Sequence, residues 1–157
     1  MTEPLTEQPT EAHIADSAEP VVFGSAEPVV QYVERRAAYV VVARDDKVAA
    51  VVGARGKYFL PGGGSLPGET PEETVTREVS EELARGVRLT HKVGEAVQYF
   101  YSGADERQYR MRATFFAGEF TDEVRGGACE HELSWLSAEE AERAFFHACH
   151  AWAARRA

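Results

Sequence analysis

The stretch GGSLPGETPEETVTREVSEELAR, residues 63–85, joins a glycine-rich loop to the start of an acidic helix. Thr70 is a favourable N-cap residue, Pro71 suits the first helical position, and Glu73 completes a capping box. These signals together predict a helix that begins after Thr70. We expect it to run through about Leu83 and to end before Gly86, because glycine is the usual residue just after a helix C-terminus.

Three carboxylates on this helix, Glu78, Glu81 and Glu82, stand at positions i, i+3 and i+4, so all three project to one side. Like charges at this spacing repel, and a cation among them reverses that effect. Hard oxygen ligands suit Mg²⁺ or Mn²⁺. A solvated acidic face is the alternative for the triplet alone. The neighbouring glycine loop favours a metal site, because its backbone can approach a phosphate or offer a carbonyl to a metal.

The order of Gly63, Glu69 and residues 77–82 (REVSEE) resembles the signature motif of the Nudix hydrolases. Residues 58–62 (YFLPG) and 67–70 (PGET) are also similar to the family's usual sequence. The motif covers residues 63–85, and a looser likeness of strands and final helix covers residues 29–154. Ala84 and Arg85 depart from it, since the family usually has glycine and then an aliphatic residue there. We therefore expect a slightly longer helix, with unchanged metal ligands.

The resemblance implies a role for each motif residue. Glu78 and Glu82 would be the main metal ligands, Glu81 would assist, and the Gly63 carbonyl would complete the set. Glu69 and Arg77 would pair and orient the ligand helix. The negative charge of Glu69 would also stabilise the N-terminus of that helix. Mg²⁺ would neutralise phosphate charge and orient a water for in-line attack on phosphorus, while a carboxylate takes the proton.

The carboxylate that acts as general base has several candidates. In the family that this sequence resembles, the general base is either a motif glutamate or a glutamate on a later loop. Glu78 fits the first option. The later candidates are Glu119, Glu123, Glu130 and Glu132. We favour Glu130 or Glu132, which directly precede the strand-like residues 133–136 and the last helix. Each can equally be an exposed loop acid.

Residues outside the motif would determine the substrate. Gly62, Gly63 and Gly64 are candidates to contact it through their backbone. Tyr99, Phe100 and Tyr101 could stack on a base, although packing is the commoner role of strand aromatics. A tyrosine near the position of Tyr101 is weakly associated with diadenosine polyphosphates in this family. Arg110 and Arg112 could bind phosphate or lie in solvent. Packing or exposure, not a transition-metal site, is the favoured explanation of three histidines, His131, His147 and His150.

The remaining sequence predicts a mixed sheet flanked by helices, an α/β (α+β) fold like the Nudix α/β/α sandwich. Apolar or alternating segments at 37–43, 48–52, 58–60, 96–101, 109–116 and 133–136 predict strands. Ser137 and Glu140 predict the capping box of one final helix. We expect a single domain over residues 29–157 and a disordered acidic tail over residues 1–20. The motif SAEPVV occurs at 17–22 and 25–30, and its second copy could open the first strand.

Composition excludes several classes of protein. No apolar run approaches the roughly 18 residues needed to cross a membrane. Two cysteines without a disulfide pattern favour the reducing cytoplasm. A net charge of −9 argues against binding duplex nucleic acid and against an RNA-decapping role. An acidic protein can still bind a polyphosphate through bridging metal ions.

These observations predict an Mg²⁺-dependent pyrophosphohydrolase. Its substrate would be a nucleoside diphosphate linked to another moiety, of the nucleoside triphosphate, dinucleoside polyphosphate or nucleotide sugar type. The alternative is a non-catalytic Nudix-fold module that senses a nucleotide. The complete set of glutamates favours the enzyme. A small-molecule nucleotide is thus the expected partner, and a homodimer is common for this fold.

Overall fold

The valine-rich segment predicted as a buried strand lies at the centre of the sheet. In the computed structural model, which describes residues 19–124 and 129–157 apart from the side chains of 54, 123 and 124, it forms β2 (Val33–Arg44). Six consecutive residues, 37–42, are buried because helices cover both faces of the sheet. Most of the predicted tail, residues 1–18, lies outside the described residues.

The sheet has eight strands in mixed orientation. Along the main path the order is β1 (Val21–Phe23), β6 (Arg85–Ser102), β7 (Arg107–Val124), β2, β3 (Lys47–Val52) and β4 (Tyr58–Phe59). β5 (Gly62–Gly64) pairs with β2, and β8 (Glu132–Ser137) pairs with β3. β7 runs parallel to β2, whereas β6 and β7 are antiparallel. The two long strands extend well beyond the predicted segments 96–101 and 109–116. The prediction was too short because charged residues in the outer halves of these strands interrupt the alternation of apolar and polar residues.

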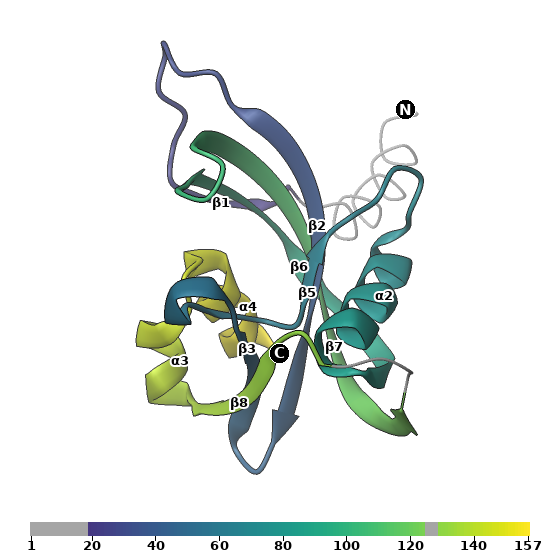
Figure 1. Cartoon of the computed structure of the whole chain (residues 1–157). Coiled ribbons are helices and arrows are strands. Elements are labelled where there is room, and N and C mark those ends of the chain that lie inside the picture. The colour runs from purple at the N-terminus through teal and green to yellow at the C-terminus, as the bar shows by residue number, and fades with distance from the viewer. Residues whose placement is uncertain (1–18, 125–128) are drawn as a thin grey trace, which may run out of the picture.

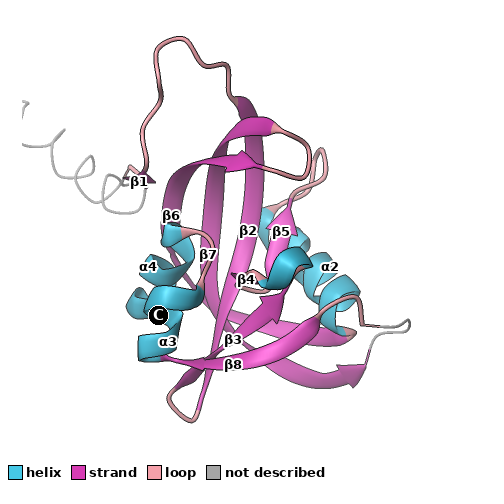
Figure 2. Ribbon diagram, turned by 60° about the vertical axis from the view of Figure 1, so that its left-hand side comes forward, coloured by secondary structure: helices cyan, strands magenta, loops and turns pink. Residues whose placement is uncertain are grey.

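Helices cover the two faces of the sheet (Figure 1). α2 (Pro71–Leu83) packs on one face through Val75 and Val79, which meet the side chains of Ala38, Val40 and Val42. α3 (Ala138–Ala144) and α4 (Ala148–Arg156) cover the other face, over Tyr39, Val41, Met111 and Phe115. Alternate residues of β2 therefore supply the two halves of the core. The predicted mixed sheet with flanking helices is confirmed (Figure 2).

The predicted final helix is wrong in one respect, because two helices replace it. The capping box of Ser137 and Glu140 opens α3 as expected. The helix then ends at Ala144, and the Phe146 N–H donates 2.9 Å to the Tyr58 carbonyl on β4. No proline or glycine interrupts the sequence here, so the tertiary bond to β4 accounts for the break.

Two boundaries differ from the sequence-based expectation. The first copy of SAEPVV, not the second, supplies β1, whose residues 21–23 pair with β6 ahead of the expected start at Val29. α2 ends at Leu83, and Ala84 takes the left-handed conformation with φ 55°. The expected run through about Leu83 is thus confirmed, but the slightly longer helix is wrong, because Ala84 occupies the stop position without being glycine. Within the described ranges, no helix is long and apolar enough to cross a membrane.

Candidate active site

Glu82 lies on the buried side of α2, where a charged side chain is unexpected. The other buried residues of this helix are Thr74, Val75, Val79 and Leu83, and Glu82 itself is only 7% exposed. Its Oε1 accepts a hydrogen bond of 3.1 Å from the Gly62 N–H. Burial, together with the nearby charges of Glu78 and Glu130, raises the pKa of Glu82 to about 8. A single hydrogen bond does not offset the free-energy cost of burying the Glu82 charge, so a cation bound at this place would stabilise the carboxylate.

Glu78, one turn before Glu82, faces the glycine strand β5. A Cβ atom on Gly63 would lie 2.6 Å from Glu78 Oε2, so no other residue fits at position 63 without displacing the carboxylate. Burial raises the pKa of Glu78 as well. The two carboxylates and the backbone of Gly63 therefore lie close together, as the resemblance implies.

Arg77 links Glu69, the ligand helix and the glycine strand through its guanidinium group. Its Nε donates 2.7 Å to Glu69 Oε2, and one Nη donates 3.0 Å to Glu69 Oε1. The same Nη donates 2.9 Å to the Gly64 carbonyl, which ties the glycine strand to the helix. The Arg77 hydrogen bonds lower the pKa of Glu69 to about 2. The predicted Glu69–Arg77 pair is thus present and is bidentate.

Glu81 shares one Arg77 nitrogen with Glu78. This Nη donates 3.2 Å to Glu81 Oε1 and 3.4 Å to Glu78 Oε2, and the Glu81 side chain is 48% exposed. Within the described residues, no three His, Cys, Asp or Glu side chains converge on a point where a metal could bind. The carboxylates of Glu78 and Glu82 are oxygen donors of the kind that a hard cation prefers, and the Gly63 backbone lies beside Glu78.

The segment after residue 128 closes the C-terminal end of α2. The N–H groups of Glu130 and His131 each donate 3.1 Å to the Glu82 carbonyl, and Cys129 Sγ donates 3.2 Å to the Leu83 carbonyl. These bonds satisfy carbonyls that a helix end leaves without partners. They also bring His131 to the edge of the cavity described next.

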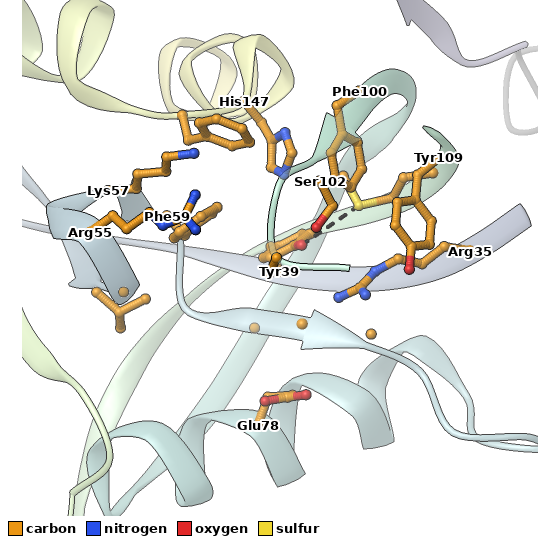
Figure 3. A pocket seen from close by; sticks show the side chains of 18 of the residues that line it. Arg35, Tyr39, Arg55, Lys57, Phe59, Glu78, Phe100, Ser102, Tyr109 and His147 are labelled. Atoms are coloured by element: carbon orange, nitrogen blue, oxygen red, sulfur yellow. Dashed lines mark hydrogen bonds between the residues drawn. The ribbon is translucent and has the colours of Figure 1, made fainter. Parts of the chain in front are cut away.

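A cavity of about 410 Å³ opens beside the two glutamates. Gly62, Gly63 and Gly64 form one edge with Glu78 and Glu82. Much of the remaining lining is aromatic and contains Tyr39, Phe59, Phe100, Tyr109, Phe146 and His147. Figure 3 shows Arg35 at one side of the cavity and Lys57 with Arg55 at the other, with the Tyr39 ring between them. Arg35 therefore lies near the acids, where its charge acts on Glu78, whereas Lys57 and Arg55 lie at the other side of the cavity.

Two buried histidines lie in or next to this aromatic lining. His150 is fully buried, and its Nδ1 accepts 3.0 Å from the Leu60 N–H just before the glycine strand. His147 lines the cavity, where burial and the positive charges of Arg35 and Lys57 lower its pKa to about 4. The interpretation of both as packing residues fits these contacts.

The favoured later glutamates do not line the cavity. Glu130 and Glu132 are both exposed, and Glu132 lies on β8 opposite Val52. Glu130 is nevertheless close enough for its charge to act on Glu82. Glu119 is exposed and pairs with Arg88. The side chain of Glu123 is not among those that the structure describes.

The candidate substrate residues on β6 and β7 divide between two places. Tyr101 lines the cavity and is half exposed. Tyr99 packs on Tyr32 and accepts 3.2 Å from Arg110 Nε. Arg110 and Arg112 also pair with Glu34 and Glu95 and line a second cavity near the start of α2. The structure therefore does not bring these two arginines to the glutamates.

Sequence reasoning missed Arg35, Arg55, Lys57, Phe146 and His147 as cavity residues. Arg35 had a usable signal, since it shares the period-two face of β2 with Tyr39. The others come from the turn after β3 and the break between α3 and α4, and their meeting depends on tertiary structure.

Comparison with known proteins identifies the family to which this fold and site belong. The profile described as "NUDIX domain" matches residues 33–155, so the chain belongs to the Nudix family. It is accordingly a hydrolase that acts on phosphorus anhydride bonds. No curated protein sequence matches the chain.

Several solved structures share the fold. A Nudix hydrolase from Nitrosomonas europaea has 19% sequence identity and a TM-score of 0.59, covering 78% of this chain and 87% of that one. A MutT Nudix hydrolase from Burkholderia pseudomallei has 22% identity and a TM-score of 0.57, covering 78% and 97%. An ADP-ribose pyrophosphatase from Streptococcus suis has 17% identity and a TM-score of 0.57, covering 76% and 88%. At these identities the likeness concerns the fold.

Proposed function

We propose that this chain hydrolyses a nucleoside diphosphate linked to another moiety, with Mg²⁺ or Mn²⁺ as cofactor and water attacking phosphorus. The observation that carries the proposal is that the buried Glu82 and the half-buried Glu78 share one cavity with a glycine edge. Family membership supplies the reaction class. The free cysteines Cys129 and Cys149 support the cytoplasm as the compartment.

Within this proposal, Glu78, Glu82 and the Gly63 carbonyl would hold the metal, with Glu81 assisting. The metal, when bound, neutralises phosphate charge and lowers the pKa of a water molecule. Glu69 and Arg77 keep α2 and the glycine strand in register through the bonds described above. Arg35, whose guanidinium lies against Gly64, binds the phosphate on the glycine edge.

Glu130 is the proposed acceptor of the water's proton. Its charge acts on Glu82, and its backbone is fixed by the bond to the Glu82 carbonyl. Glu132 is the weaker candidate because it is exposed on β8. A Glu130→Gln variant that lost turnover but still bound Mg²⁺ would support this assignment, and full activity would exclude it.

The first experiment measures phosphate and nucleotide release with and without Mg²⁺ over nucleoside triphosphates, nucleotide sugars, ADP-ribose and dinucleoside polyphosphates. Glu82→Gln should lower metal-dependent turnover by more than about 100-fold. Glu139→Gln, an exposed acid on α3, is the matched control and should retain full activity. Nucleotide binding without any turnover would instead favour the sensor module.

A further inference from the structure

The side of the cavity formed by Arg55 and Lys57 carries positive charge without a counterion. Among the described residues no carboxylate forms an ion pair with either side chain, and Asp105, a carboxylate that also lines the cavity, accepts a hydrogen bond from Tyr109 instead. Lys57 Nζ lies 4.0 Å from the centre of the Phe146 ring, which supports the cation without neutralising it. One Nη of Arg55 would lie 3.1 Å from a Cβ atom on Gly103, across the mouth of the cavity. Two cations thus share one wall.

The backbone that carries these cations is held in an unfavourable conformation. Arg55 has φ 64° and ψ 20°, a left-handed geometry that costs a residue with a Cβ atom free energy. The turn is closed by hydrogen bonds from the Gly53 N–H to the Lys57 carbonyl, 2.8 Å, and from the Gly56 N–H to the Gly53 carbonyl, 3.2 Å. Glycine or asparagine would adopt this conformation at position 55 with less strain. The presence of arginine there therefore points to a role for its side chain.

These cations are well separated from the part of the cavity that would hold the diphosphate. Arg35 and Glu78 lie beside the glycine strand, while Lys57 and Arg55 lie at the other side (Figure 3). The rings of Tyr39, Phe59, Phe100 and His147 line the space between. A ligand that spans the cavity therefore has an anion at the glycine edge, a flat apolar part in the middle, and a second anionic group at Lys57.

We propose that Lys57 and Arg55 bind a phosphomonoester of the substrate that is separate from the diphosphate to be cut. This inference rests on the proposed function, because it assigns the diphosphate to the glycine edge. A phosphate dianion can offset both charges and accept hydrogen bonds from both side chains. A neutral carbonyl on a base edge would offset neither charge. The substrate class is thus a nucleoside diphosphate derivative with an additional phosphate on its sugar.

A binding experiment tests the subsite without turnover and without metal. Calorimetry would compare adenosine 2′,5′-bisphosphate and adenosine 3′,5′-bisphosphate with adenosine 5′-monophosphate in buffer free of divalent ions. At least one bisphosphate should bind about tenfold more tightly, the effect of one additional charged hydrogen bond. Lys57→Met and Arg55→Met should each reduce this preference. Lys47→Met makes the same change at an exposed site outside the cavity and should keep it.

A turnover experiment then uses matched substrates with Mg²⁺: NADPH against NADH, and coenzyme A against dephospho-coenzyme A. The phosphorylated member of at least one pair should have the higher kcat/KM, through a lower KM, and Lys57→Met should shrink that ratio about tenfold. Equal binding of mono- and bisphosphates, or a preference unchanged in both variants, would overturn the inference. Selective binding without hydrolysis of any substrate would leave the subsite standing and overturn the proposed function instead.

Discussion

Gly63 and Glu78 are in such close contact that a single added carbon would collide, since a Cβ atom on Gly63 would lie 2.6 Å from Glu78 Oε2. The Gly63→Ala variant must therefore displace the carboxylate or the glycine strand. We expect turnover to fall about 100-fold, because misplacing a reacting group by about 1 Å has that order of effect. Steady-state kinetics over a range of Mg²⁺ concentrations measures this loss.

Gly68→Ala is the control for the Gly63 variant. Gly68 lies in the same loop, has φ 81°, and has no atom within 4 Å of its would-be Cβ. The change should lower stability through backbone strain, by about 1 kcal/mol, and leave turnover near the wild-type value. If the two variants lost activity equally, crowding of Glu78 would not be the cause.

Arg77 should act as a positioning residue, not as a direct ligand of substrate. Arg77→Lys keeps the charge but cannot make two parallel bonds to Glu69 and a third to the Gly64 carbonyl. We expect activity and apparent Mg²⁺ affinity to fall by 10- to 100-fold, the usual effect of losing a residue that orients ligands. An unchanged Mg²⁺ dependence combined with a raised substrate KM would instead place Arg77 in contact with substrate.

The sequence predicts most reliably what is decided within a few residues. The capping box of Thr70 and Glu73 and the glutamate face depend on the spacing of residues at a helix start and along a helix, and the resemblance to the family implies the pair of Arg77 and Glu69. The structure shows the capping box and the pair as expected. The central strand was equally clear, because six consecutive apolar residues require cover on both faces.

The cavity wall could not be predicted in this way. Its residues come from β2, the turn after β3, the end of β6 and the break before α4, and only tertiary packing brings these segments together. The same applies to the break itself, because a single backbone bond from Phe146 to Tyr58 outweighs the helical pattern of the sequence. For the same reason, Arg110 and Arg112 were grouped with the site although ion pairs hold them elsewhere.

The end of α2 offers a stabilising substitution. Ala84 has φ 55° at the C-cap, a conformation that glycine adopts without strain. Ala84→Gly should raise the free energy of unfolding by about 1 kcal/mol, measured by urea denaturation. Ala154→Gly, inside α4, should lower it by about 1 kcal/mol. A loss of stability in both variants would contradict the left-handed geometry at position 84.

The buried His147 should make the fold sensitive to acid. Its pKa falls from the ordinary 6.5 to about 4 in the folded protein, mainly through burial. The unfolded chain therefore binds the proton first as the pH falls, so the stability contribution is complete above about pH 6.5 and is lost on the way down to about pH 4. Between pH 7.5 and 5 this amounts to about 2 kcal/mol. Denaturation at both pH values should show that the difference in free energy of unfolding between pH 7.5 and 5 is smaller by that amount in His147→Asn. The exposed His91→Asn should keep the wild-type difference. If His147→Asn kept the full wild-type difference in free energy of unfolding between the two pH values, the acid sensitivity would belong to other groups.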